Sequence, residues 1–237
     1  MRKVEACTRE ALGAAISAVT SQDARGFFEL RLPASESTAM TDAANRYLFR
    51  LLNDVWTNPA LDPCMIFLGH INDYGVVWLV LLGALAALGG KTGRWTALAG
   101  LAALAVGLVS SEVLKSLVMQ PRPFVSLPDV RLLVSPPSSY SFPSVNATYA
   151  FAASSGASLT ARRLLGRLPI WGWGFLALAV AVSYSRVYVG VHYPGDVLGG
   201  AIIGTSIGWL IAAIGDRVGK EGALERPTTR DEGDRTG

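Results

Sequence analysis

Long apolar runs, broken by short charged stretches, constrain this chain more than any other feature of its sequence. They occupy about 61–90, 95–118, 143–161, 170–188 and 196–214 of its 237 residues. A helix rises about 1.5 Å per residue, so about 20 apolar residues cross the hydrocarbon core of a bilayer. Because a segment in lipid has no water to bond its backbone, spanning segments of this length form helices. The sequence therefore predicts an all-α fold, a polytopic integral membrane bundle of five or six transmembrane helices.

The composition excludes several other classes of protein. Hydrophobic residues make up 51% of the chain and charged residues 16%, a balance too apolar for an ordinary soluble domain. The net charge of +3 collects in short loops and a tail, so we interpret it as a topology signal and expect no nucleic-acid partner. Cys7 and Cys64 lie far apart, and the only histidines are His70 and His192. These residues favour neither a disulfide framework nor a metal centre, and no metal or other cofactor is expected.

The pattern divides the chain into an N-terminal interfacial segment over 1–59, a membrane domain over 60–215, and a charged, disordered tail over 216–237. In the first segment, apolar residues recur at helical spacing beside charged ones, namely Tyr47, Leu48, Leu51, Leu52 and Val55. This spacing predicts an amphipathic helix, which lies either on the membrane surface or against the protein's own spans. No early apolar run follows Arg2 and Lys3, so no cleavable signal peptide is expected.

The positions of lysine and arginine predict the orientation of the bundle. They gather in three stretches, at 91–94, 162–167 and 217–220. Because successive spans cross the membrane in opposite directions, all three stretches lie on the same side of it. Cytoplasmic loops carry the excess of positive charge, so that face is cytoplasmic and the loop over 120–142 is on the non-cytoplasmic side. Five spans then leave the N-terminus outside, and a sixth crossing within 1–59 is the alternative.

Two cations follow the second apolar run, in the stretch Lys115-Ser116-Leu117-Val118-Met119-Gln120-Pro121-Arg122-Pro123. Lys115 and Arg122 are seven residues apart, which on a helix places them on nearly one face, and Pro121 is expected to end the helix. Cations where hydrocarbon meets water are costly without an anionic partner, and a lipid phosphate would be such a partner. The alternative is that both side chains extend to the lipid headgroups without forming a site.

A second stretch, from Ser185 to Asp196, carries an arginine, a histidine and a carboxylate. Arg186 offers a planar fork that suits phosphate oxygens. Pro194 predicts a helix start, which puts Asp196 in the first turn, four residues after His192. There the carboxylate accepts a hydrogen bond from one ring nitrogen of His192 and leaves the other nitrogen free as a nucleophile. For such a pair alone, a structural hydrogen bond is the usual alternative.

A third stretch, Ser141-Phe142-Pro143-Ser144-Val145-Asn146, precedes the third apolar run and predicts a helix start. Free backbone N–H groups at that start, together with the Ser144 hydroxyl, are suited to bind an anion. A plain helix cap is the alternative for this stretch taken alone.

Together these motifs make the chain similar to the type 2 phosphatidic acid phosphatase family of integral membrane lipid phosphatases. That family carries Lys-x6-Arg-Pro, Pro-Ser-Gly-His and Ser-Arg-x5-His-x3-Asp, and the resemblance covers roughly residues 60–215, with the first and third motifs intact. Within the family, the chain looks most similar to bacterial undecaprenyl-diphosphate phosphatases, through its motif spacing and the stretch Asn58-Pro59-Ala60-Leu61-Asp62.

The resemblance implies a helical membrane fold and metal-independent release of phosphate from a polyprenyl diphosphate or a related phospholipid such as phosphatidic acid. It implies that four residues bind phosphate, namely Lys115, Arg122, Ser144 and Arg186. By the same resemblance, His192 attacks phosphorus to form a phosphohistidine, and Asp196 orients His192. The protein would then be an integral protein of the bacterial cell (inner) membrane, active on the non-cytoplasmic face, with the bilayer and a phosphorylated lipid as partners.

One motif departs from the family pattern. Asn146 stands where the resemblance implies the histidine that protonates the leaving oxygen, and an amide has no titratable proton to give. Loss of a general acid costs ~10²- to 10⁴-fold in rate. Val145 also replaces the family's glycine and adds a side chain to the phosphate-binding turn. His70 and Asp73 are alternative acids, although a structural role is more usual for such a pair.

Three hypotheses for Asn146 stay open. In the first, it is an engineered change that slows an ordinary phosphatase. In the second, it is natural, and the leaving group needs little protonation, as with a diphosphate that departs as a phosphate monoester with a second pKa of ~6. In the third, the chain is a non-catalytic lipid-phosphate binding or transport protein, or a lipid phosphotransferase. We predict a membrane lipid phosphatase and keep the third hypothesis as the alternative.

Overall fold

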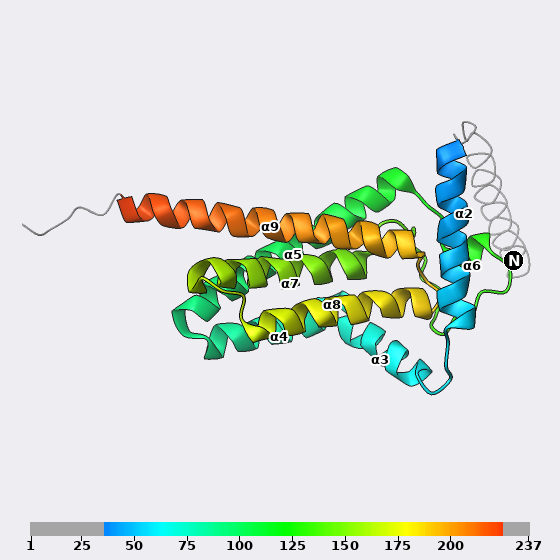
Figure 1. Ribbon diagram of the computed structural model, residues 1–237, viewed down its shortest axis with the longest axis horizontal. Helices are drawn as coiled ribbons and strands as arrows, with labels where there is room; N and C mark the ends of the chain where they lie inside the picture. Colours follow the sequence, from blue (N-terminus) through cyan, green and yellow to red (C-terminus); the bar gives the residue numbers. More distant parts are fainter. Residues whose placement is uncertain (1–35, 225–237) are drawn as a thin grey trace, which may run out of the picture. The chain divides into compact units, whose positions relative to one another are not determined.

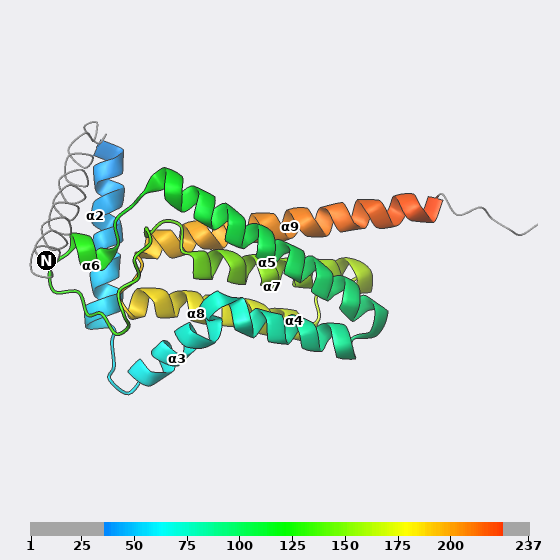
Figure 2. The same cartoon turned by 180° about the vertical axis from the view of Figure 1, so that it is seen from behind.

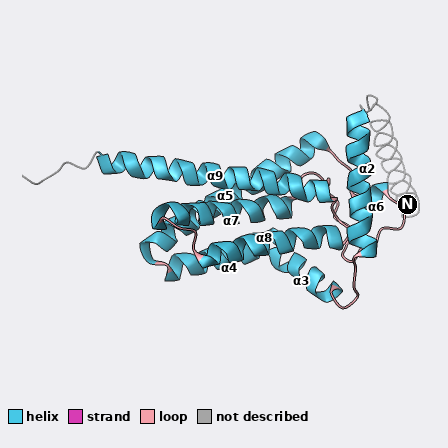
Figure 3. Cartoon of the chain, in the orientation of Figure 1, coloured by secondary structure: helices cyan, strands magenta, loops and turns pink. Residues whose placement is uncertain are grey.

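Every regular element within residues 36–224 is a helix, and this is the part of the chain that the computed structural model describes, with side chains from 42 to 217. Figure 3 shows this part without a strand, which confirms the all-α prediction. Residues from Asn45 onward form one compact unit, while residues 1–35 of the predicted interfacial segment lie outside the description. The elements are α2 (Glu36–Arg50), η1 (Leu51–Val55), α3 (Asp62–Asn72), η2 (Asp73–Gly75), α4 (Val76–Leu88), α5 (Gly90–Val118), α6 (Pro123–Ser126), α7 (Val145–Leu165), α8 (Ile170–Tyr188) and α9 (Pro194–Leu224).

The long helices of this unit run alongside one another, as Figures 1 and 2 show from two sides. Helix α7 lies in the middle and packs against α5, α8 and α9, and α4 packs against α5. Helix α3 packs against α8 and joins α4 through the short turn η2. A bundle of helices satisfies the backbone groups of each spanning segment within that segment, as a membrane requires. The predicted helical membrane bundle is confirmed.

Four segments are long and apolar enough to cross a membrane: Asp62–Leu88, Gly90–Ser126, Ile170–Tyr188 and Pro194–Arg217. They coincide with four of the predicted spans. Helix α7 coincides with the remaining one but is less apolar, because it lies inside the bundle and its buried face carries many Ala, Ser, Gly and Thr residues. Small residues let neighbouring helices approach closely, whereas high hydropathy is needed only where a helix meets lipid. The number of crossings, five or six, stays a prediction.

Glycines four residues apart on α9 bring this helix very close to α7. A Cβ atom on Gly204 would lie 2.2 Å from the carbonyl oxygen of Thr148, and one on Gly208 would lie 2.0 Å from a side-chain oxygen of α7. Such a stripe of small residues allows two helix backbones to touch. The contact also aligns the starts of the two helices, where the Ser144 N–H donates to the carbonyl of Asp196 at 3.0 Å.

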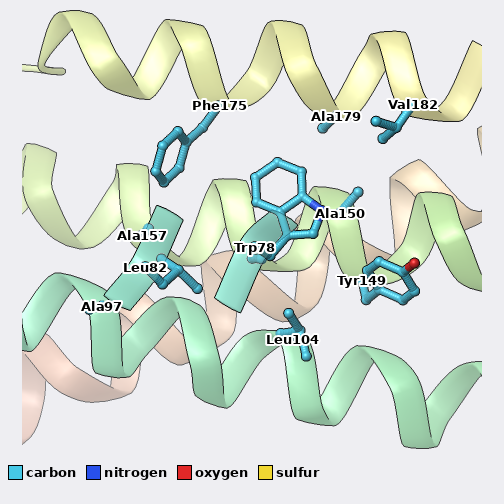
Figure 4. Close-up of a cluster of buried hydrophobic side chains, with 11 residues drawn as sticks. Trp78, Leu82, Ala97, Leu104, Tyr149, Ala150, Ala157, Phe175, Ala179 and Val182 are labelled. Atoms are coloured by element: carbon cyan, nitrogen blue, oxygen red, sulfur yellow. The ribbon is translucent and has the colours of Figure 1, made fainter. Parts of the chain in front are cut away.

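A cluster of buried apolar side chains fills the space between α4, α5, α7 and α8. Figure 4 shows Trp78 in this cluster with Leu82, Leu104 and Tyr149. The rings of Trp78 and Phe175 meet edge to face, with centroids 5.8 Å apart, a favoured arrangement for aromatic pairs. Because Tyr149 also borders the cavity that holds the sequence motifs, the core and the site are continuous.

The segment 45–55 packs on the same unit through two buried residues. The ring of Phe49 meets that of Tyr193 edge to face at 5.5 Å, and the Asn53 amide donates to the carbonyl of Tyr188 at 2.8 Å. Of the predicted apolar face, Leu52 packs beside Phe49, whereas Tyr47, Leu48 and Val55 are exposed. Of the two alternatives for this segment, these contacts favour the one in which it lies against the protein's own helices.

The last helix extends past the predicted domain boundary. The sequence predicts a disordered tail over 216–237, whereas α9 runs on to Leu224. No proline interrupts the chain between Pro194 and Pro227, and glycine alone weakens a helix without ending it. Residues 216–224 are therefore helical, and the rest of the predicted tail lies outside the described residues.

Candidate active site

A cavity of about 510 Å³ brings the three sequence motifs together. Its walls come from α3, α5, α7, the end of α8 and the loop between α6 and α7. Five of the predicted site residues line it, namely Lys115, Arg122, Asn146, Arg186 and His192. Helix ends that are far apart in the sequence thus converge on one pocket that holds three cations and an imidazole.

The two cations of the first motif do not share a helix. Helix α5 ends with Lys115 in its last turn, because Met119 takes a left-handed conformation with φ 49°. Helix α5 thus ends at Val118, before the predicted break at Pro121, and Arg122 is the N-cap residue of the next helix, α6. Both side chains nevertheless reach the hydroxyl of Ser139, at 3.3 Å from Lys115 Nζ and 3.0 Å from Arg122 Nη2.

Carbonyl oxygens of the loop complete the positioning of these cations. Lys115 Nζ donates to the carbonyl of Tyr140 at 2.5 Å, and Arg122 Nε donates to that of Ser139 at 2.7 Å. Arg122 Nη1 donates to the carbonyl of Val191 at 2.8 Å. Both cations are buried, so donors held in this way act in a low dielectric and need little reorganisation when an anion binds.

The contacts of His192 assign its tautomer. Its Nε2 lies 3.1 Å from Arg122 Nη1, and its Nδ1 lies 3.4 Å from Asp196 Oδ2. A guanidinium only donates, so Nε2 must be the unprotonated acceptor and Nδ1 must carry the hydrogen that faces Asp196. The free lone pair of His192 therefore lies on the nitrogen beside Arg122.

The charge state of His192 follows from its surroundings. Complete burial lowers the pKa of His192 to about 4, the nearby Arg122 and Lys115 act in the same direction, and the hydrogen bond with Asp196 opposes them. The imidazole is therefore neutral at pH 7, and its contact with Asp196 is a hydrogen bond rather than an ion pair. A neutral imidazole keeps the lone pair that a nucleophile needs.

Asp196 lies in the first turn of α9, as the sequence predicts, and is held by two further donors. The Ser141 hydroxyl donates to Asp196 Oδ2 at 2.5 Å, and the Tyr193 N–H donates to the same oxygen at 2.8 Å. Ser141 Oγ also lies 3.5 Å from His192 Nδ1. Sequence reasoning missed the contact of Ser141, since the serine belongs to a different motif from the histidine and carboxylate that it joins.

Arg186 lies against a glycine of α3 that the sequence does not assign to the site. A Cβ atom on Gly69 would lie 1.3 Å from Arg186 Nη2, so the guanidinium occupies the space of the missing side chain. Arg186 Nε donates to the Ser185 hydroxyl at 3.3 Å, and Nη1 lies 4.0 Å from Asp73 Oδ1. The sequence feature that could have pointed to this contact is the interruption of an apolar run by Gly69 and its polar neighbours.

Ser144 is a predicted phosphate ligand that does not line the cavity. Its side chain is fully buried and accepts from the Ala147 N–H at 3.5 Å, which makes it the N-cap of α7. The geometry matches the plain helix cap that the sequence leaves open. Its neighbour Val145 does line the cavity.

The residue in the place of the family's general acid and the two alternative acids border the same cavity. Asn146 is at the start of α7, and the two alternative acids, His70 and Asp73, come from the end of α3 and from η2. His70 Nδ1 donates to the carbonyl of Ile66 at 2.9 Å, so its Nε2 is the nitrogen without a proton when the ring is neutral. Within the described residues, no group of three or more His, Cys, Asp or Glu side chains is placed to hold a metal ion.

Comparison with known proteins gives a consistent set of relatives. Residues 95–220, which carry all three motifs, match the family model described as the PAP2 superfamily. Undecaprenyl-diphosphatase of Sulfolobus acidocaldarius is 36% identical to this chain over 176 residues, which are 72% of this chain and 78% of that protein. Undecaprenyl-diphosphatase BcrC of Bacillus subtilis is 32% identical over 161 residues, 67% of this chain and 77% of that protein.

A solved structure shares the arrangement of the helices. The first transmembrane PAP2 type phosphatidylglycerolphosphate phosphatase from Bacillus subtilis superposes with a TM-score of 0.61 at 25% identity. The likeness covers 76% of this chain and 88% of that one.

Proposed function

The chain belongs to the PAP2 superfamily and is a membrane phosphatase by that membership, and we propose that it releases phosphate from a polyprenyl diphosphate or a related phospholipid, without a metal, through a phosphohistidine at His192. The proposal rests above all on one observation, the position of His192 between Arg122 and Asp196. In that position Nε2 carries the free lone pair and faces Arg122, while Nδ1 carries the hydrogen and faces the carboxylate of Asp196.

The proposed reaction begins when three cations take up the phosphate. Lys115, Arg122 and Arg186 border the cavity with N–H groups that can donate to phosphate oxygens. The 3.1 Å contact between Arg122 Nη1 and His192 Nε2 is then given up in favour of a phosphate oxygen. Positive groups that face the equatorial oxygens stabilise the charge of the transition state, which is the main contribution of proteins to phosphoryl transfer.

His192 then carries the phosphoryl group. Its Nε2 lone pair attacks phosphorus, the bond from phosphorus to the leaving oxygen breaks, and the lipid departs with that oxygen and its electron pair. The hydrogen on Nδ1 stays on the ring, where Asp196 stabilises the positive charge. In the second step water attacks phosphorus, the electron pair of the N–P bond returns to Nε2, and dihydrogen phosphate leaves with both protons of the water.

One observation supports a diphosphate as substrate, and a second supports a lipid. The relatives from Sulfolobus acidocaldarius and Bacillus subtilis are named undecaprenyl-diphosphatases. Apolar side chains also line the cavity beside its cations, among them Ile66, Leu108 and Val134. Apolar groups next to a phosphate site suit a substrate whose charged head continues into a hydrocarbon chain.

We place the site on the non-cytoplasmic face of a bacterial cell membrane. Lys91 and Arg94 lie at the start of α5, whereas the cavity residue Lys115 lies at its end. Arg162 and Arg163 lie at the end of α7, whereas Asn146 lies at its start. The basic residues thus occupy the helix ends away from the site, and basic loops are typical of the cytoplasmic face.

Asn146 favours a second candidate, a protein that binds or transfers a lipid phosphate without efficient hydrolysis. Its amide lines the cavity and cannot give a proton to a leaving oxygen. In this candidate Lys115, Arg122 and Arg186 hold the phosphate, and water does not attack it.

Phosphate release by the purified protein in detergent separates the two candidates. With undecaprenyl diphosphate and a chelator present, we expect release that His192→Ala abolishes and that Ser206→Ala, on the exposed side of α9, leaves unchanged. Release that depends on an added divalent ion, or that survives His192→Ala, would contradict the proposed mechanism. Lipid binding without release in the unaltered protein would favour the second candidate, and transfer to a labelled acceptor lipid would identify a phosphotransferase.

A further inference from the structure

The amide of Asn146 is held by a relay of hydrogen bonds behind the cavity. Its Oδ1 faces two donors, the Tyr149 hydroxyl and Nδ2 of Asn72, the latter at 3.3 Å. Asn72 is fully buried, and its Oδ1 accepts from the indole N–H of Trp78 at 2.9 Å. Because Trp78 and Tyr149 belong to the packed core in Figure 4, the relay is anchored at both ends.

One orientation of the two amides satisfies this relay. The indole N–H only donates, so it faces the oxygen of Asn72 and turns the NH₂ of Asn72 toward Asn146. With the NH₂ of Asn72 in front of it, Asn146 presents its own oxygen to the relay. The Tyr149 hydroxyl has one hydrogen and faces two acceptors, this oxygen and the backbone carbonyl of Asn72, so the NH₂ of Asn72 is the donor that sets the orientation of Asn146. Its NH₂ then turns away, and no described residue accepts from it. Since Asn146 lines the cavity, this NH₂ is the group available to a bound phosphate.

A fixed NH₂ donates a hydrogen bond but does not transfer a proton. When the bond from phosphorus to the leaving oxygen breaks, an alkoxide leaving group needs a proton from the protein. A lipid that leaves as a phosphate monoester, with a second pKa of ~6, keeps the electron pair and needs none.

We propose that Asn72 is a positioning residue that fixes the NH₂ of Asn146 toward the cavity. Because this NH₂ donates a hydrogen bond but gives no proton to the leaving oxygen, turnover is restricted to lipid diphosphates. The inference rests on the proposed phosphatase function and adds to it a residue, Asn72, and a reason for substrate choice. The step it concerns is attack by His192, in which Asn146 stabilises the departing phosphate without protonating it.

Farnesyl diphosphate and farnesyl monophosphate test the substrate choice, because they share a chain and differ in leaving group. We expect kcat/KM to favour the diphosphate by ~10²-fold or more, and Asn146→His to shrink this preference at least about tenfold by restoring a proton donor. Equal kcat/KM for the two lipids would overturn the proposal. A strong preference that arises only after His70→Gln or Asp73→Asn would assign proton donation to that residue and would also overturn it.

Asn72→Asp tests the positioning role. The introduced carboxylate still accepts from Trp78 but offers no N–H to Asn146, so the Asn146 amide rotates and turns its oxygen toward the cavity. We expect kcat/KM for farnesyl diphosphate to fall about tenfold or more, since a buried phosphate would then meet an acceptor. In the Asn146→His background the same change is expected to leave the rate unchanged or raise it, because a carboxylate pairs with a ring N–H and fixes the tautomer.

Asn53→Asp is the matched control, since Asn53 is equally buried but donates to the carbonyl of Tyr188, away from the cavity. We expect Asn53→Asp to change kcat/KM for farnesyl diphosphate by the same factor in the unaltered protein and in Asn146→His. If Asn72→Asp also lowered kcat/KM by the same factor in both proteins, the positioning role would be overturned. If Asn72→Asp does not fold, Asn72→Ala is expected to lower the diphosphate rate less in the Asn146→His background, and equal losses would again overturn it. Failure of the proposed function is distinct, because neither lipid would then release phosphate in a way that His192→Ala abolishes.

Discussion

His192 Nε2 lies 3.1 Å from Arg122 Nη1, so the proposed nucleophile and a proposed phosphate ligand are in direct contact. A phosphate that binds must separate them, with an oxygen on the guanidinium and phosphorus facing Nε2. Binding and alignment for attack are therefore one event in this site. The hydrogen bond of His192 with Asp196 keeps the ring in place while Arg122 changes partner.

The ionisation of His192 is directly measurable, because the chain has only two histidines. Burial lowers the pKa of His192 to about 4, so in an NMR titration of histidine-labelled protein we expect one ring to stay neutral, with its proton on Nδ1, until the pH approaches that value. His192→Gln assigns the signal. A midpoint for His192 near the ordinary 6.5 would contradict the burial argument.

The same pKa shift predicts how stability depends on pH. Because the pKa of His192 is lower in the folded protein than in the unfolded chain, the unfolded state binds the proton more strongly. Its contribution to stability is complete above pH 6.5 and is lost as the pH falls toward about 4. The midpoint of thermal unfolding in detergent should fall over this range, and should fall less in His192→Gln.

Gly69→Ala should separate activity from stability. The added methyl group would occupy the position of Arg186 Nη2, so the guanidinium must move, and displacement of a positioning group by about 1 Å can cost ~10²-fold in rate. Alanine favours a helix interior over glycine by about 0.5–1 kcal/mol, so thermal stability should stay equal or rise. Gly83→Ala, where a Cβ meets nothing within 4 Å, is the control and should leave the rate unchanged. An active Gly69→Ala protein would show that Arg186 is not needed in its present place.

Ser139→Ala should weaken phosphate binding more than it affects the fold. The hydroxyl accepts from both Lys115 and Arg122, and hydrogen bonds to charged groups contribute about 1.5–3 kcal/mol. Loss of these bonds should raise KM about tenfold or more and weaken inhibition by inorganic phosphate. Ser135→Ala is the matched control, because Ser135 lines the same cavity without a hydrogen bond to either cation. Equal KM values for the two variants would remove Ser139 from the site.

Gly204→Ala should reduce the yield of folded protein. Its methyl group would lie 2.2 Å from the carbonyl oxygen of Thr148, so α9 must move away from α7 and carry Asp196 with it. Gly174→Ala, with nothing within 4 Å of the added atom, should behave like the unaltered protein. Thermal unfolding in detergent compares the two, and equal midpoints would contradict the close packing of α7 and α9.

The helices were predictable where proline and apolar length mark them. The span over Ile170–Tyr188 and the helix start at Pro194 match the sequence prediction, because proline fixes the first turn of a helix and the long apolar run allows no other structure in lipid. Asp196 beside His192 follows from the same start, since their spacing of four residues is local.

Contacts made across the bundle were not predictable from spacing. Ser139, Ser141 and Gly69 touch site residues only because a loop and α3 fold over the cavity. Met119 ends α5 by a left-handed turn, although proline was the visible signal for a break. Ser144 shows the converse, because a motif serine that suits an anion also suits a helix cap, and the contact with the Ala147 N–H became visible only in the structure.

The most direct test of the account is to look for a phosphoryl group on His192. After rapid mixing with a lipid diphosphate labelled in its terminal phosphate, an alkaline quench and peptide mapping should find acid-labile label on the peptide that contains His192. His192→Gln should carry no label and release no phosphate. Turnover without label on that peptide, together with phosphate release by His192→Gln, would contradict nucleophilic attack by this residue.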